Sequence, residues 1–63
     1  MLELHYSERG KKLACIITQY NEKTKEMKTL YHAVINMEIE NTLQFLCDTK
    51  EIYLRLLEAH HDS

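Results

Sequence analysis

Apolar side chains recur along the first half of the chain at alternating spacings of four and three positions. The series runs through Leu13, Ile17, Tyr20, Thr24, Met27, Tyr31 and Val34. Spacings of this kind place side chains on one stripe of an α-helix, as in a coiled coil. We therefore expect a helix over about residues 8–34, with Ser7 as its N-cap.

A second series with the same spacing begins at Ile35 and continues to His60. The two series do not join in register, because extending the first would put Glu38 on the apolar stripe. We expect a break near residue 35 and a second helix over about residues 36–61. Acidic residues then begin the second helix, which suits the helix dipole. A break at 21–24 and an unbroken rod are the alternatives.

The first residues of the chain follow a different period. Residues 2–6 alternate apolar and polar positions, which is typical of a strand. A hairpin through residues 7–10 into 11–20 is conceivable, since residues 14–18 are rich in β-favouring types. As a strand, however, that segment would present apolar groups on both faces of a sheet. A chain of 63 residues is too short to cover both faces. We therefore expect residues 1–7 to form only a tail or a short strand.

These elements predict an all-α fold in which residues 1–63 form a single domain, an antiparallel helical hairpin. Two helices touch along one line only, so much of each apolar stripe stays exposed. The simplest remedy is a twofold homodimer that closes a four-helix bundle. The expected dimer or partner interface comprises Leu13, Ile17, Tyr20, Met27, Leu30, Tyr31, Val34, Ile39, Leu43, Leu46, Tyr53, Leu56 and Leu57.

Composition supports self-association in place of other means of stabilisation. The chain has 63 residues with one Gly, no Pro and two Cys, too few cysteines for a disulfide framework. A core of this size rarely contributes more than about 3–5 kcal/mol. The net charge of −2 divides into +2 for residues 1–31, six basic less four acidic, and −4 for residues 32–63, two basic less six acidic. Such opposite halves attract each other.

Candidate chemistry is sparse. The four histidines include no pair three or four positions apart, so we expect no metal site and no cofactor. A helical hairpin offers no cleft for a nucleophile, and Gly10 alone cannot form a phosphate-binding loop, so an enzyme is not expected. No apolar run is long enough to span a bilayer, and because the first ten residues have no apolar h-region we expect no signal peptide. Two unpaired cysteines fit a reducing cytoplasm.

The expected function is therefore a non-enzymatic protein–protein interaction module, a small adaptor or regulator that dimerises and binds a larger protein through helix faces. An acidic row opposite the second stripe is a candidate partner face, formed by Glu40, Asp48, Glu51 and Glu58. The alternative is a dimeric nucleic-acid-binding regulator that uses the basic segment Arg9–Lys28. Nucleic acid is disfavoured as a partner, because these cations scatter around a helical wheel and the pI is near 6.0.

Overall fold

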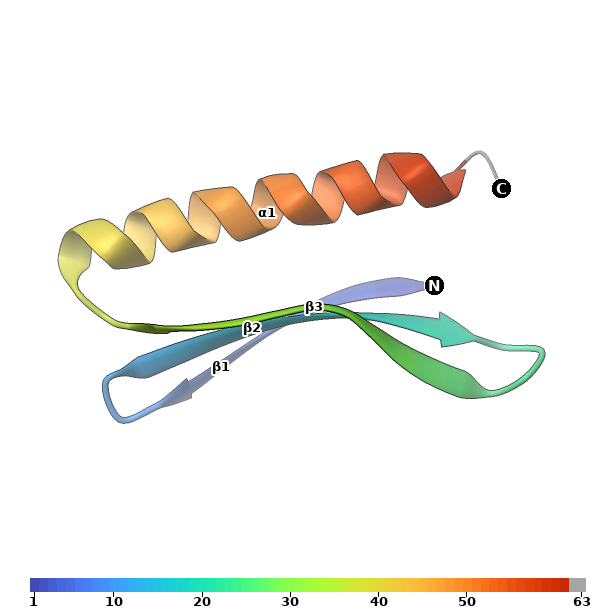
Figure 1. Cartoon of the computed structure of the whole chain (residues 1–63), viewed down its shortest axis with the longest axis horizontal. Helices are drawn as coiled ribbons and strands as arrows, with labels where there is room; N and C mark the ends of the chain where they lie inside the picture. Colours follow the sequence, from blue (N-terminus) through green and yellow to red (C-terminus); the bar gives the residue numbers. More distant parts are fainter. Residues whose placement is uncertain (62–63) are drawn as a thin grey trace.

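The computed structural model describes residues 1–61 and contains three strands followed by one helix (Figure 1). The elements are β1 (Leu2–Arg9), β2 (Lys12–Asn21), β3 (Glu26–Asn36) and α1 (Ile39–His61). The expectation of an all-α hairpin closing into a four-helix bundle is therefore wrong. The segment 8–34, expected to be helical, forms the end of β1, all of β2 and most of β3. The two apolar series fail to join because one lies in the sheet and the other mainly in the helix.

The strands form one antiparallel meander in the order β1-β2-β3. In the central strand β2, Leu13, Cys15 and Ile17 are buried beneath α1, while Ala14 and Ile16 alternate onto the opposite face. The need to cover this second apolar face was the reason for preferring a helix over a strand here. The neighbouring strands leave Ala14 and Ile16 half-buried there, so the sheet tolerates an open second face.

Two short turns connect the strands. Gly10 occupies the first position of a two-residue turn with φ 61°, as in a type II′ hairpin. In the longer turn, the Asn21 carboxamide oxygen accepts a hydrogen bond from the Lys23 backbone N–H at 3.0 Å. Lys25 there takes the left-handed conformation with φ 59°, and its N–H donates to the Asn21 carbonyl at 2.7 Å. The alternative break at 21–24 thus falls at the turn between β2 and β3, whereas the expected break near residue 35 falls inside β3, two residues before the connection to α1 at residues 37–38.

A β-bulge interrupts the pairing of β2 with β3. Ile17 pairs with Tyr31 and Thr18 with Thr29, so Leu30 is the extra residue on β3. Bulges of this kind bend the strand and increase its twist.

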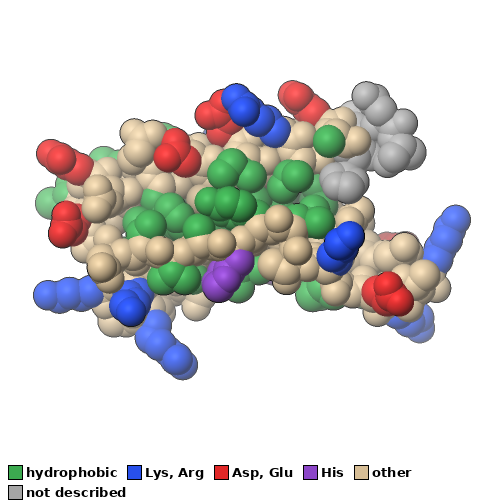
Figure 2. Space-filling view, viewed as in Figure 1, with side chains coloured by type: hydrophobic (Ala, Val, Ile, Leu, Met, Phe, Trp, Pro, Cys, Tyr) green, Lys and Arg blue, Asp and Glu red, His purple; other side chains and the backbone are tan. Residues whose placement is uncertain are grey.

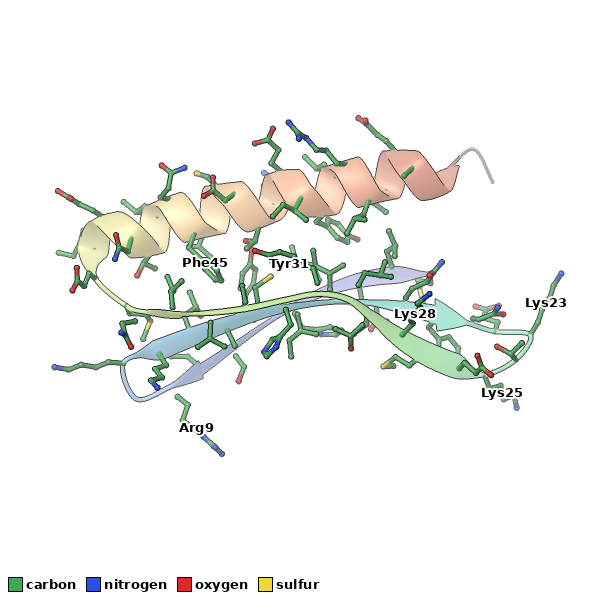
Figure 3. All side chains as sticks on the ribbon, viewed as in Figure 1. Arg9, Lys23, Lys25, Lys28, Tyr31 and Phe45 are labelled. Carbon is green, nitrogen blue, oxygen red and sulfur yellow. The ribbon has the colours of Figure 1, made fainter. Side chains whose placement is uncertain are left out.

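Helix α1 lies across one face of the sheet and buries the core between the two layers (Figure 1). Phe45 from the helix is buried against Leu13, Cys15 and Ile17. Figure 3 shows Phe45 and Tyr31 extending into the space between helix and sheet. Around this centre pack partly buried apolar residues from β1, β3, α1 and the connection between β3 and α1: Leu4, Tyr31, Ala33, Ile35, Met37, Ile52, Tyr53 and Leu56.

The two layers also differ in charge. Acidic side chains follow the helix, whereas most lysine and arginine side chains lie along the sheet and its turns (Figure 2). The sheet segment through Asn36 holds six basic and four acidic residues, which gives +2. The separation inferred between the two halves of the chain therefore becomes a separation between two layers.

Candidate functional site

Helix α1 carries an apolar surface that the sheet does not cover, and we call it the apolar flank. At 100° per residue its members fall within about 80° of the helix circumference, next to the core-facing stripe. Ile39 is 84% exposed and Leu43 is 64% exposed. The complete apolar flank consists of Ile39, Leu43, Leu46, Leu54 and Leu57, all exposed. An amphipathic helix packed on one sheet needs only one apolar stripe, so this second one is surplus to the fold.

Beside the apolar flank, a polar junction of hydroxyl groups connects α1 to strand β1. Thr49 is fully buried, and its hydroxyl donates to the Phe45 carbonyl at 2.9 Å. The Tyr6 hydroxyl from β1 hydrogen-bonds to the same Thr49 oxygen at 2.5 Å. The Tyr53 hydroxyl donates to the Leu2 carbonyl at 3.4 Å, a longer contact between the same elements. The orientation of the helix is therefore fixed on the β1 side by hydroxyl groups as well as by packing.

The two cysteines lie in different environments. Cys15 is buried beside Thr49, and burial raises the pKa of its thiol, although a hydrogen bond with Thr49 opposes part of that effect. A protonated, inaccessible thiol is a poor nucleophile. Cys47 is exposed on the helix, and both thiols are free.

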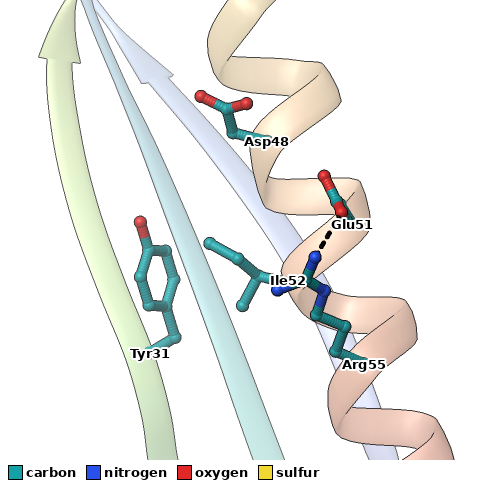
Figure 4. Close-up of a pocket in the computed structure, with 5 residues that line it drawn as sticks. All are labelled: Tyr31, Asp48, Glu51, Ile52 and Arg55. Atoms are coloured by element: carbon teal, nitrogen blue, oxygen red, sulfur yellow. Dashed lines mark hydrogen bonds and ion pairs between the residues drawn. The ribbon is translucent and has the colours of Figure 1, made fainter.

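The opposite side of α1 holds a shallow pocket of about 310 Å³ facing β3 (Figure 4). Its charged groups are already paired within the helix: Arg55 donates to Glu51 at 2.7 Å, and Gln44 donates to Asp48 at 2.8 Å. Tyr31 and Ile52 complete the wall. The expected acidic face is therefore present as exposed residues of α1, with Glu40 and Glu58 on the same helix, but two of its four carboxylates are engaged locally.

A second pocket, which we call the basic pocket, lies on the face of the sheet away from α1. It has a volume of about 350 Å³ and is lined by Ser7, Arg9, Lys12, Ala14 and Val34. Strand pairing explains the set, because Ser7 lies opposite Ala14, which lies opposite Val34, and Arg9 lies opposite Lys12. Figure 3 shows the Arg9 side chain extending away from the helix.

The sequence-derived interface residues separate into three groups. Leu13 and Ile17 lie in the core, and Tyr31, Tyr53 and Leu56 pack against it. Tyr20 and Leu30 are half-buried in the sheet, where Met27 and Val34 are exposed. The structure brings together Ile39, Leu43, Leu46 and Leu57 on the apolar flank.

The apolar pattern of the second helix also leaves Leu54 exposed beside the stripe, as the structure places it, by its helical spacing from Leu43 and Leu57. The sequence patterns did not reveal the basic pocket. Arg9 and Lys12 meet Ser7, Ala14 and Val34 only when the strands pair, and the alternation over residues 2–6 was the available sign of the first hairpin.

Within the described residues, no three His, Cys, Asp or Glu side chains come close enough to hold a metal ion. No helix in residues 1–61 combines the length and apolar character that crossing a membrane requires. Comparison with known proteins finds no matching family model, no matching curated protein and no matching solved structure.

Proposed function

We propose that this chain is a non-enzymatic protein-interaction module that forms a homodimer through the apolar flank of α1. The observation that carries the proposal is the run of five exposed apolar residues along one side of a helix whose other apolar stripe is already buried. Water contact with such a surface is unfavourable, at about 25 cal/mol per Å² of apolar area. A second copy supplies a surface of the same character.

The surface area and the radius of gyration of the chain support a second copy as the partner of the apolar flank. A compact monomer of 7.5 kDa has an accessible surface of about 4,200 Å². This chain exposes 5238 Å², an excess of about 1,000 Å² over that expectation. A standard interface covers about 800 Å² on each partner. The radius of gyration of 13.1 Å likewise exceeds the value of about 10.6 Å for a compact domain of this length. The excess surface is thus of the size that one dimer contact covers.

Residue spacing favours an antiparallel arrangement of the two helices. With a twofold axis near residue 48, Ile39 of one copy lies opposite Leu57 of the other, and Leu43 lies opposite Leu54. Lys50 then faces Leu46, whose side chain its aliphatic stem covers. A parallel pair would instead set Lys50 against the same lysine of the other copy, which like charge disfavours.

Sedimentation analysis of a matched pair of variants tests this interface. Leu43 in the apolar flank and Met27 on the sheet are each 64% exposed, so a lysine at either site costs the fold similarly little. We expect the wild-type chain and Met27→Lys to sediment as dimers at micromolar concentration, and Leu43→Lys to sediment as a folded monomer.

Two outcomes overturn the proposal. A folded wild-type monomer at the highest concentration reached shows that the flank does not bind a second copy and leaves it to a different protein. Equal dissociation of both lysine variants shows that the dimer forms elsewhere. Circular dichroism on every sample confirms that the helix and sheet are retained.

A further inference from the structure

The face of the sheet away from α1 carries positive charge without a partner. Within the described residues, neither Arg9 nor Lys12 forms an ion pair. Glu8 adjoins Arg9 in sequence but pairs with Leu13, whose side chain is in the core, so Glu8 lies on the helix side. The nearest acidic residue on the open face of β1 is Glu3, about 20 Å along the strand from Arg9. It is already paired with His5 at 3.0 Å.

The groups around the basic pocket suit a phosphate. A guanidinium donates two parallel hydrogen bonds to phosphate oxygens, and a lysine ammonium adds a mobile point charge. The Ser7 hydroxyl supplies a further donor at the same wall, while Ala14 and Val34 provide apolar contact for the carbon atoms of a ligand. A phosphate attached to a partly apolar group fits this lining better than a bare inorganic ion does.

The next row of the open face extends the site beyond one phosphate. His5 lies opposite Ile16, which lies opposite His32, one row away from the basic pocket, at a separation of about 7 Å. Both imidazole rings are exposed and flank a half-buried apolar side chain. Exposed planar rings on an open sheet are groups on which unpaired bases stack. Phosphate-binding and base-stacking groups thus follow one another along the strands.

From this arrangement we propose that the open face of the sheet binds single-stranded nucleic acid, with Arg9, Lys12 and Ser7 holding a phosphate and the row of His5, Ile16 and His32 contacting bases. The acidic residues of α1 lie in the other layer. At physiological salt the Debye length is about 8 Å, so their repulsion of a strand on the open face is weak. This proposal does not depend on dimerisation through the apolar flank.

Fluorescence anisotropy with a labelled short oligothymidylate at several salt concentrations tests the site. The variant Arg9→Ala/Lys12→Ala removes both cations of the basic pocket. The control Lys28→Ala/Arg55→Ala removes the same charge, from exposed residues outside the basic pocket. We expect the pocket variant to bind roughly tenfold more weakly or worse, and the control to bind as the wild type does. Loss of two phosphate contacts should also lower the slope of log affinity against log salt by about 1.4.

Two further probes separate a strand from other phosphate sources. Inorganic phosphate that displaces the oligonucleotide at an equal concentration of phosphate groups shows a simple anion site and overturns the proposal. Phosphatidylserine vesicles that bind more tightly than the strand, through the same two cations, overturn it in favour of a lipid surface. Absence of oligonucleotide binding, or equal weakening in both variants, also refutes it. The proposal is supported if neither phosphate nor vesicles compete with the oligonucleotide and only the pocket variant loses affinity for it.

Discussion

The hydroxyl of Thr49 is the sharpest place to test how the helix is held on the sheet. The substitution Thr49→Val replaces the hydroxyl by a methyl group and keeps the side chain branched at Cβ. It removes the hydrogen bond with the Tyr6 hydroxyl, which joins residues 43 positions apart in the chain. The Phe45 and Leu46 carbonyls, which also accept from this hydroxyl, keep their ordinary helical N–H donors, and the Cys15 thiol loses only a weak hydrogen bond.

The expected cost follows from which groups lose a partner. One neutral hydrogen bond contributes about 1 kcal/mol net. Tyr6 is 41% exposed and the contact of its hydroxyl with Thr49 is only partly buried, so we expect water to reach that hydroxyl in the variant without a larger burial penalty. For a domain of this size, with a total near 3–5 kcal/mol, a loss of about 1 kcal/mol is large. It corresponds to a decrease in Tm of about 4–8 °C.

Urea and thermal denaturation at one fixed protein concentration measure this effect, because any self-association makes stability depend on concentration. Tyr6→Phe should cost a similar amount, and the double variant should cost hardly more than either single one. We assign the anchor of the helix to the hydroxyl pair of Tyr6 and Thr49. This assignment is refuted if Thr49→Val is as stable as the wild type, or if the costs of the two single variants add in the double variant.

Two other predictions concern the thiols and the first turn. Because burial raises the pKa of Cys15, the folded chain keeps the thiol proton when the unfolded chain has lost it. Stability should therefore be complete below the ordinary thiol pKa of about 8.5 and fall as the pH rises through the folded value. Cys15→Ala should lack this part of the pH dependence in urea titrations, and a thiol reagent should label exposed Cys47 quickly but Cys15 only on unfolding. Gly10→Ala should cost about 1 kcal/mol in thermal melts, because φ is 61° and no atom crowds the added Cβ. Lys11→Ala in the same turn, the control, should leave stability nearly unchanged.

The pattern of residues indicated the helix but concealed the sheet. Leu13 and Ile17 are spaced four apart, which suits a helical stripe, yet they also belong to the alternation Leu13, Cys15, Ile17 that the sheet uses. Over so short a segment the two periods share residues, and the choice depends on a partner strand outside the segment. Residues 2–6 supply that partner, and pairing with them decides the outcome.

The candidate surface on the helix could be predicted from the sequence, whereas the one on the sheet could not. Members of the apolar flank such as Ile39 and Leu43 were identifiable because helical spacing alone places them together. The basic pocket was not, because only the pairing of the three strands brings Arg9 and Lys12 together with Ser7, Ala14 and Val34 on one face. A site built from neighbouring strands depends on register, which local composition does not specify.

The order of the elements along the chain also affects the kinetics of folding. Each strand pairs with its neighbour in sequence through a short turn, so the meander forms from local contacts with little loss of loop entropy. Docking of α1 onto β1 joins residues as far apart as Leu2 and Tyr53, 51 positions, and belongs to a later stage. Changes at the turns should therefore act mainly on the folding rate. Changes at the helix anchor should instead act on the unfolding rate, so the lifetime of the native state depends on that anchor.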